Sequence, residues 1–343
     1  MRIGSSLLVL IALGLLAGCS NDSASESSAD LARAAEPAPI ERAQGIAHAN
    51  GIEIAYEMVG PPQGEAVLFI LGLGGQMSEG PDSFIEALAA RGFRAIRFDN
   101  RDIGRSTKLE KAGPPPSMET IIAALSEGKP APVAYTLADM AKDAVGLLDA
   151  LGIEKAHIVG GSMGGMIAQL VAADFPERTL SLTSIMSTSG NPELPLGPAV
   201  ELLGQSAGFE GTEEEMLDRK VKLFRALEGP AYRKDEAALR ESIKRNMERS
   251  SYPVGVARQT AATVPNSDRR AKLETIHVPT LIIHGDSDPI FPPEHARDQA
   301  KHIAGSELLI LEGVGHDLPE ALIPKIVDAI SDLAQRARAR NGE

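Results

Sequence analysis

A serine surrounded by glycines stands between an apolar run and a helix-forming run of this chain. Residues 160–165 read Gly-Gly-Ser-Met-Gly-Gly and follow the apolar residues 156–159. A serine in the order Gly-x-Ser-x-Gly sits on a sharp turn from strand to helix, where the strained backbone leaves no room for side chains two residues away. Such a turn raises the Ser162 hydroxyl above a sheet and places the N–H of Met163 at a helix N-terminus, where it can stabilise an oxyanion. The pattern predicts a nucleophile elbow.

A phosphate-binding turn is the alternative interpretation, because strand, glycines and helix also form nucleotide sites. It fits this chain less well. No lysine follows the glycines as a P-loop requires, the order Gly-x-Gly-x-x-Gly is absent from the turn, and the next apolar run, residues 180–186, has no acidic residue for a ribose. We therefore expect Ser162 to act as a nucleophile.

Two further apolar runs end in residues that could activate this serine. Residues 280–285 precede Asp286 and Asp288, and residues 307–311 precede His316. A serine nucleophile needs a general base and a group that orients the base, and the chain order expected for an elbow serine is Ser, then Asp or Glu, then His. We therefore expect His316 to be the base and one of the two aspartates to orient it.

The chain has seven histidines, and the others are weaker candidates for the general base than His316. His284 stands at the strand end that carries the aspartates. It precedes them, which is the wrong order for the base, so we expect a supporting hydrogen bond at most. His295 and His302 fall on the helical stretch 293–303, where a solvated or half-buried position is expected.

Taken together, these motifs make the chain similar to the α/β-hydrolase fold family of serine hydrolases, from about Gly45 to the C-terminus. In that family the acid commonly follows the pattern Gly-x-x-Asp after the penultimate strand. Residues 285–288 match this pattern. The resemblance therefore implies that Asp288 is the acid, and Asp286 is the alternative.

The same resemblance implies a second donor for the oxyanion hole. In the family this N–H comes from the loop after the third strand, often with the sequence His-Gly-x. Here residues 67–70 run into Leu71-Gly72-Leu73, so the N–H of Leu73 is the expected donor beside that of Met163. Leu71 stands where many relatives have histidine, and the glycines of this loop could instead be plain turn residues.

A charged loop extends the resemblance. Residues 99–106 read Asp-Asn-Arg-Asp-Ile-Gly-Arg-Ser and look like the Asp-x-Arg-x-x-Gly-x-Ser loop of the family. Together with the elbow, this loop resembles the branch that includes aclacinomycin methylesterase. We expect its charges to be structural, with Arg101 paired to a neighbouring carboxylate beneath the active site. A contact between Arg101 and the substrate is the alternative.

Apolar runs alternate with helical patterns along most of the chain, which favours the α/β class and a mostly parallel sheet covered by helices on both faces. The family implies eight strands. The pair Asn50-Gly51 between two such runs predicts a two-residue hairpin at the front of the sheet. We expect residues 45–186 and 266–343 to form this α/β-hydrolase core.

Between residues 187 and 265 the alternation stops, and helical patterns follow one another without strands. We expect this insertion to be a helical lid. Thr212 and Glu215 have the spacing of a capping box. Apolar stripes follow within residues 217–224 and 239–247, and we expect them to pack against the sheet domain or to line a pocket for an apolar acyl or alcohol group.

The amino terminus carries a separate signal. The apolar run 7–16 is too short for a transmembrane helix and suits a secretory signal, and the following Leu-Ala-Gly-Cys resembles a bacterial lipobox. We expect residues 1–18 to be a lipoprotein signal peptide, Cys19 to be lipidated, and residues 19–44 to be a disordered tether. The protein would face the periplasm, at the outer membrane rather than the inner one. The alternative is an ordinary cleaved signal with an incidental cysteine.

Composition narrows the possible partners. The formal net charge is −13, so nucleic acid is not an expected partner and strongly anionic substrates are disfavoured. Because Cys19 is the only cysteine, an intramolecular disulfide is excluded. No spacing typical of a metal site is present, and no cofactor is expected. The expected partner is a small-molecule ester, and the oligomeric state is left open.

These observations predict a serine hydrolase that cleaves a carboxylic ester of small to medium, largely apolar character through an acyl-enzyme. The same triad also serves amide cleavage, as in proline iminopeptidases, and hydrolysis of C–C bonds in diketones. A cofactor-free peroxidase side activity is known in the family. The non-enzyme alternative is a lipid-anchored binding protein with an idle triad.

Overall fold

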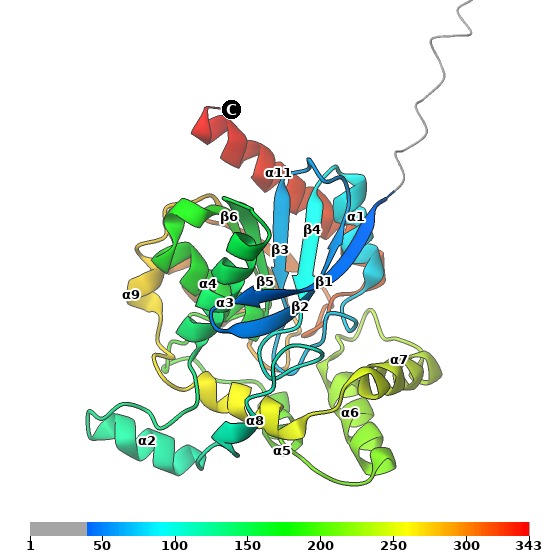
Figure 1. Cartoon of the computed structure of the whole chain (residues 1–343), viewed down its shortest axis with the longest axis vertical. Helices are drawn as coiled ribbons and strands as arrows, with labels where there is room; N and C mark the ends of the chain where they lie inside the picture. Colours follow the sequence, from blue (N-terminus) through cyan, green and yellow to red (C-terminus); the bar gives the residue numbers. More distant parts are fainter. Residues whose placement is uncertain (1–39, 343) are drawn as a thin grey trace, which may run out of the picture. The chain divides into compact units, whose positions relative to one another are not determined.

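The computed structural model describes residues 40–342, so the predicted signal peptide, Cys19 and most of the predicted tether lie outside it. Within the described residues, eight strands form one sheet in the order β1-β2-β4-β3-β5-β6-β7-β8 (Figure 1). The strands are β1 (Arg42–Ala49), β2 (Ile52–Val59), β3 (Ala66–Ile70), β4 (Arg94–Phe98), β5 (Ala156–Gly161), β6 (Thr179–Ile185), β7 (Thr280–Gly285) and β8 (Glu307–Leu311).

The predicted eight-stranded, mostly parallel sheet is confirmed. β1 and β2 pair antiparallel, β2 joins β4 antiparallel, and every pairing from β4 through β3 to β8 is parallel. The predicted hairpin joins β1 to β2 through Asn50 and Gly51, with φ of 47° and 78°. Positive φ at both central residues is what a type I′ turn requires, which explains the Asn-Gly pair.

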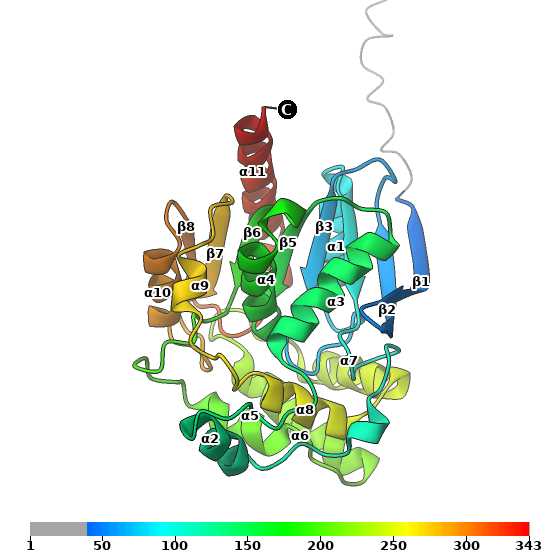
Figure 2. The same cartoon turned by 60° about the vertical axis from the view of Figure 1, so that its left-hand side comes forward.

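Helices cover both faces of the sheet (Figure 2). Alternate residues of β3 point to opposite faces, as in any strand: Leu68 and Ile70 join the apolar cluster of α3 and α4, whereas Val67 and Phe69 join that of α1 and α11. These helices are α1 (Asp82–Ala90), α3 (Leu137–Ala150), α4 (Met163–Asp174) and α11 (Ile323–Asn341), and the shorter α9 (Arg270–Leu273) and α10 (Glu294–His302) flank β7.

Between β6 and β7 the chain forms α9 and, before it, four further helices that we call the inserted helices: α5 (Ala199–Ser206), α6 (Glu213–Leu227), α7 (Glu236–Arg249) and α8 (Pro253–Ala262). No strand interrupts them in this described part of the chain. The capping box forms as predicted, because Thr212 Oγ1 accepts from the N–H of Glu215 and the carboxylate of Glu215 accepts from the N–H of Thr212.

The apolar stripes of α6 and α7 were expected to pack against the sheet domain or to line a pocket, and the first of these expectations is wrong for their buried centre. Leu217 of α6 meets Leu239, Ile243 and Met247 of α7 in a separate small cluster. The two helices bury these stripes against each other, which needs no contact with the sheet.

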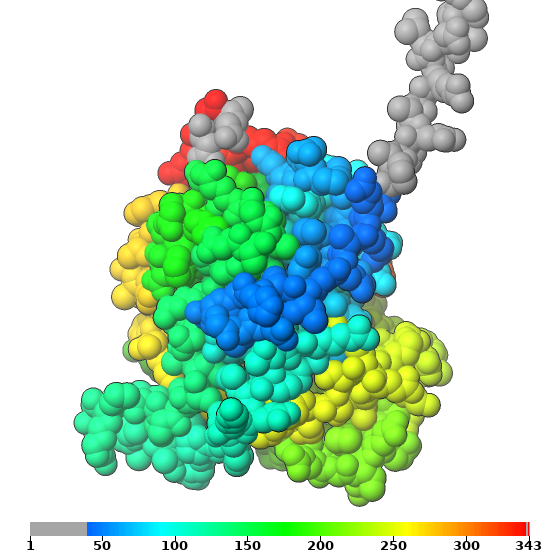
Figure 3. All heavy atoms as spheres, in the orientation of Figure 1, coloured from blue at the N-terminus to red at the C-terminus, as the bar shows by residue number. Residues whose placement is uncertain are grey.

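A helix that the sequence analysis did not anticipate, α2 (Met118–Ser126), follows β4. Ser117 caps it by accepting from the N–H of Thr120. Its side chains Met118, Ile122 and Leu125 are exposed, and Figure 3 shows the helix projecting from one edge of the surface. No helix in residues 40–342 combines the length and apolar character needed to cross a membrane.

The charged loop after β4 fixes other elements by ion pairs. Arg101 donates to both carboxylate oxygens of Asp143 on α3, at 2.5 and 2.6 Å, which confirms the expected structural pairing. Asp102 accepts two hydrogen bonds of 2.8 Å from Arg258 of α8. Arg249, at the end of α7, donates to Asp99 at 2.7 and 3.1 Å. Two of the three pairs therefore hold inserted helices on the core.

Breaking one of these pairs should cost much of the protein's stability. Arg258 and Asp102 are both buried, so Arg258→Gln leaves a buried carboxylate without its cation and should lower the free energy of unfolding by about 3–5 kcal/mol. Urea unfolding followed by circular dichroism measures this. The control is Arg245→Gln, which breaks an exposed pair with Glu241 and should cost less than about 0.5 kcal/mol. Equally small losses of unfolding free energy in the two variants would contradict the proposal that the pair of Arg258 and Asp102 anchors α8 on the core.

Candidate active site

Ser162 adopts the strained conformation that its glycine context predicts. It lies between β5 and α4 with φ 55° and ψ −121°, and its N–H donates to the carbonyl oxygen of Ile185 at 2.9 Å. A Cβ on Gly164 would stand 2.0 Å from the carbonyl oxygen of Ile70, and one on Gly160 would stand 2.1 Å from that of Gly164. Both positions therefore require glycine, because the neighbouring atoms are backbone and cannot move aside.

The structure brings the three predicted side chains together from the ends of three strands. His316 Nε2 lies 2.8 Å from Ser162 Oγ, and His316 Nδ1 lies 2.8 Å from Asp288 Oδ2. Ser162 follows β5, Asp288 follows β7 and His316 follows β8. The carboxyl ends of parallel strands share one edge of a sheet, which is why residues far apart in sequence meet here.

Of the two candidate acids, Asp288 is the one that reaches the histidine. Asp288 is buried, and its Oδ1 accepts from the N–H groups of Ile290 and Phe291 at 2.8 and 2.9 Å. Asp286 is exposed; its Oδ1 accepts from the N–H of Gly313 at 2.8 Å. Asp286 therefore stabilises the turn after β8, whereas Asp288 holds the imidazole.

The surroundings of Asp288 keep it ionised. Burial alone would raise its pKa, but the charge of His316 and hydrogen bonds from His284 and His316 lower the pKa well below its ordinary value. His284 Nε2 lies 3.3 Å from Asp288 Oδ2 and 2.7 Å from the carbonyl oxygen of Phe291. An ionised acid in this position favours the tautomer of His316 that can accept a proton at Nε2. His284 thus takes the supporting position expected for it.

Two backbone N–H groups close to Ser162 lack a hydrogen-bond partner within the described residues. A Cβ on Gly72 would lie 3.2 Å from Ser162 Cβ, so the loop after β3 runs directly against the serine. Neither the N–H of Leu73 nor that of Met163 has a hydrogen-bond acceptor in residues 40–342. The loop is held by Gln259 of α8, whose Oε1 accepts from the N–H of Gly74 at 2.9 Å. Both N–H groups are free to bind an oxyanion.

A cavity of about 480 Å³ contains the serine, and we call it the main cavity. Its wall is mostly apolar and comes from the elbow, α2, α5, α8 and the loops after β6 and β7. The lining includes Leu73, Met118, Ser162, Met163, Leu196, Val200, Leu203, Ala207, Arg269, Ile290, Phe291 and His295. Such a wall suits an apolar group of medium size.

His295 was expected to be solvated or half buried, and that expectation is wrong. The side chain is 1% exposed and lines the main cavity. Its Nδ1 lies 2.8 Å from Thr188 Oγ1, and its Nε2 lies 3.1 Å from the carbonyl oxygen of Pro195. These two partners satisfy both ring nitrogens, and burial lowers the pKa of the imidazole. The helical pattern gave no sign of the loop that covers this histidine.

The loop that carries His316 is joined to the end of α6. The N–H of His316 donates to the carbonyl oxygen of Leu227 at 2.7 Å, and a Cβ on Gly315 would stand 2.2 Å from that same oxygen. Next to the histidine, both carboxylate oxygens of Asp317 are buried and have no hydrogen-bond partner in the described chain. Burial raises the pKa of Asp317, although the nearby ammonium of Lys234 opposes the shift.

Several residues around the site were missed by sequence reasoning. Met118 at the mouth of the main cavity belongs to the unanticipated α2, and Arg249 and Arg258 pair with the loop after β4 across a long sequence separation. The cap Ser117 and the apolar residues after it were the available signal for α2. No comparable signal pairs a particular arginine with a particular aspartate. Within residues 40–342, no cluster of three or more His, Cys, Asp or Glu is placed to hold a metal ion.

Comparison with known proteins agrees with this fold. The sequence pattern of the family described as the α/β-hydrolase fold matches residues 65–320, and the chain belongs to that family.

Among its relatives, rhodomycin D methylesterase DauP from a Streptomyces species is 33% identical over 296 residues, which cover 80% of this chain and 92% of that protein. Rhodomycin D methylesterase DnrP from Streptomyces peucetius is 31% identical over 296 residues, which again cover 80% of this chain and 92% of that protein. The crystal structure of the enol-lactonase from Burkholderia xenovorans has a TM-score of 0.65 at 20% identity and covers 85% of this chain and 100% of that one; it shows the fold alone. These relationships support hydrolase activity on an ester.

The buried carboxyl of Asp317 predicts a pH-dependent effect on stability. Its pKa is raised in the folded chain, so the folded state becomes less favourable as pH rises through the interval between the unfolded and the folded pKa. Asp317→Asn should therefore stabilise the protein at pH 7, and the gain should shrink as pH falls towards about 4, the ordinary pKa of an aspartate, because the folded and unfolded states of the wild type then differ less in the protonation of Asp317. Urea midpoints at the two pH values measure this.

The control for that experiment is Glu312→Gln, which changes an exposed acid of the same loop and should leave the midpoint unchanged at both pH values. An Asp317→Asn variant that is less stable than wild type at pH 7 would show that the ionised carboxylate is favourable in the fold.

Proposed function

We propose that this protein hydrolyses carboxylic esters through a covalent acyl-enzyme on Ser162. The observation that carries the proposal is the unbroken series of two 2.8 Å contacts from Ser162 Oγ through His316 to Asp288. The strained elbow, the two unpartnered N–H groups and the kinship with methylesterases support it. An idle triad in a binding protein would have no need of this geometry.

In the proposed mechanism, the Ser162 hydroxyl attacks the ester carbonyl while His316 Nε2 takes its proton. The N–H groups of Leu73 and Met163 hold the tetrahedral oxyanion, and each donor lowers the barrier by about 3 kcal/mol. His316 then protonates the leaving alcohol, which departs and leaves the acyl group on Ser162. A water activated by His316 releases the acid, and Asp288 orients the imidazole and stabilises its charged form throughout.

The shape of the site supports a largely apolar ester of small to medium size. The main cavity of about 480 Å³ has room for one such acyl or alcohol group. We further propose that residues 187–265 act as a lid over the core formed by residues 45–186 and 266–343, since α5 and α8 provide part of the cavity wall. Ester cleavage is favoured over amide or C–C cleavage because DauP and DnrP are named as methylesterases.

For the amino terminus we propose a lipid anchor on Cys19 that holds the protein at a membrane facing the periplasm, with the outer membrane favoured. The support is the sequence Leu-Ala-Gly-Cys after the apolar run 7–16. Metabolic labelling with palmitate tests this: incorporation should be lost in Cys19→Ser, and equal incorporation in both proteins would contradict it.

The first prediction concerns the reaction class. The purified chain should hydrolyse p-nitrophenyl acetate, butyrate and octanoate, and should act far more slowly on aminoacyl amides, on diketones, and in peracid formation from acetate and peroxide. Ser162→Ala should remove ester turnover while leaving the circular dichroism spectrum unchanged. Faster cleavage of an amide or a diketone than of any ester would contradict the proposal and would indicate an amide hydrolase or a C–C bond hydrolase instead.

The second prediction separates the two aspartates. Asp288→Asn should lower kcat by orders of magnitude, about 10⁴-fold in a comparable triad, because His316 loses the partner that fixes its tautomer. Asp286→Asn is the matched control and should change kcat by less than about tenfold, since Asp286 accepts hydrogen bonds from Ser287 and Gly313 and not from His316. A larger loss in the Asp286 variant would reverse the choice of acid.

A further inference from the structure

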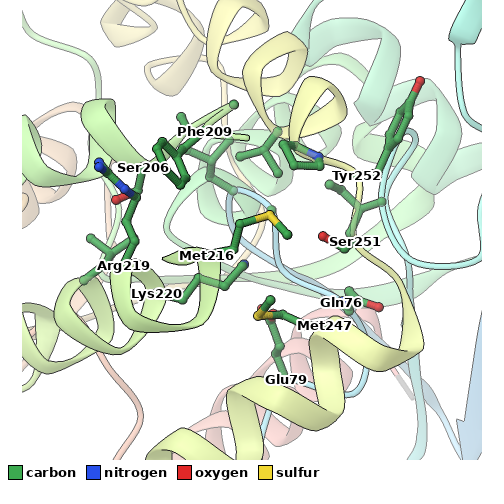
Figure 4. A pocket seen from close by; sticks show the side chains of 18 of the residues that line it. Gln76, Glu79, Ser206, Phe209, Met216, Arg219, Lys220, Met247, Ser251 and Tyr252 are labelled. Carbon is green, nitrogen blue, oxygen red and sulfur yellow. The ribbon is translucent and has the colours of Figure 1, made fainter. Parts of the chain in front are cut away.

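A second cavity is lined by the inserted helices and by the loop after β3 (Figure 4), and we call it the side cavity. Its volume is about 140 Å³. It shares Leu73, Leu203 and Ala207 with the main cavity, so the residue that offers the oxyanion N–H stands at the boundary between the two. A substrate group that passes Leu73 would enter the side cavity.

Most of the wall of the side cavity is apolar and comes from the inserted helices. It includes Phe209, Met216, Leu223, Phe224, Met247 and Val256. Three charged side chains interrupt this wall: Glu79, Arg219 and Lys220. Glu79 comes from the loop after β3, and Lys220 comes from α6 and reaches into the cavity.

Lys220 and Glu79 face the same space without forming an ion pair. Lys220 is half buried, and its ammonium has no hydrogen bond or ion pair with any described residue. Glu79 is also half buried, and its Oε2 lies 3.6 Å from the position that a Cβ would take on Gly75. Burial raises the pKa of Glu79, although Lys220 and the N–H of Gln76 oppose the shift.

The Gln76 amide and the other charged groups near the side cavity are occupied. The Gln76 amide donates to the carbonyl oxygens of Asn246 and Ser250 and accepts from Arg249. Arg249 is paired with Asp99. Arg219 lies over the ring of Phe209 at 3.9 Å and donates to the carbonyl oxygen of Gln205. Lys220 and Glu79 are therefore the two charged groups of this wall with bonding capacity for a ligand.

The pair discriminates between possible ligand groups. A methyl-terminated chain would displace water from both charges and return no hydrogen bond. A carboxylate would satisfy Lys220 and be repelled by ionised Glu79, and an ammonium would satisfy Glu79 and be repelled by Lys220. A hydroxyl or a carboxamide accepts from Lys220 and donates to Glu79 at the same time. A cavity of about 150 Å³ holds a ligand of the size of benzene, so a short polar group fits.

We propose that the side cavity binds a hydroxyl or carboxamide group carried by one branch of the ester, held between Lys220 and Glu79. The inference rests on the proposed esterase function and adds two specificity-determining residues to it. The preferred substrate is then an ester with an apolar part in the main cavity and a neutral polar end beyond Leu73.

The test compares esters that differ in one terminal group. Two series are used, one varied on the acyl chain and one on the alcohol chain, each ending in methyl, hydroxymethyl, carboxylate or aminomethyl. For wild type, kcat/KM of the hydroxymethyl ester should exceed that of the methyl ester by about tenfold in one of the series, as expected for a hydrogen bond to a charged group. In Lys220→Met this ratio should fall towards one.

Two further variants complete the design. Glu79→Gln removes the negative charge and should raise the relative kcat/KM of the carboxylate-terminated ester in the same series. Lys222→Met, an exposed position two residues away on α6, should leave every ratio as in wild type. Thermal unfolding of all variants shows whether a change in kcat/KM reflects loss of fold.

The inference is overturned if wild type prefers the methyl or the carboxylate ester in both series. It is equally overturned if Lys220→Met lowers kcat/KM for every ester by the same factor and also lowers the unfolding temperature, because the two charged side chains would then have a structural role. Failure of the proposed function looks different: no ester of either series would be turned over in a way that depends on Ser162.

Discussion

The site depends on a strained backbone at Ser162 that the surrounding chain cannot release. A φ of 55° in a non-glycine residue costs about 1–3 kcal/mol and persists only where packing fixes it. Here Gly160 and Gly164 let β3, β5 and α4 approach so closely that a single Cβ on either would meet backbone atoms at about 2 Å. The same contacts set the serine hydroxyl beside His316 and leave the N–H of Met163 without an acceptor in the described chain. The proposed nucleophile and the proposed oxyanion donor thus follow from one packing constraint.

A second constraint determines which substrate groups can fit beside Ser162. The two cavities are bounded by the inserted helices, and these helices are fixed on one side by the pairs of Asp99 and Asp102 with Arg249 and Arg258. On the other side, the end of α6 is bonded to the backbone of His316 itself. The helix α6 is therefore joined directly to the loop that carries His316, and displacement of α6 would disturb this histidine as well as the binding space.

Much of the core and the triad geometry could be predicted because the signals are local. A glycine pattern that admits one backbone conformation marks the elbow, and an acid or a histidine directly after an apolar strand marks the shared edge of a parallel sheet. Asp288 could be separated from Asp286 only through the family resemblance, since both follow the same strand. The structure supplies the physical reason, because only Asp288 is buried beside His316, whereas Asp286 bonds to Gly313.

What escaped prediction depends on tertiary packing. The apolar stripes of α6 and α7 have the period of amphipathic helices, but this period does not indicate which element each stripe packs against. In the structure the two helices bury their stripes against each other. His295 is covered by a distant loop around Pro195, and Lys220 of α6 lines the same cavity as Glu79 of the loop after β3. Pairings of this kind have no local signature, so substrate specificity is the part of the function least accessible from the sequence.

The central claim is that Ser162 is an activated nucleophile, and a fluorophosphonate probe tests it most directly. Intact mass spectrometry of the purified chain, followed by peptide mapping, should show one adduct located on Ser162, and the Ser162→Ala variant should remain unlabelled. A correctly folded wild-type protein that takes up no probe, or an adduct that persists in the alanine variant, would contradict the claim.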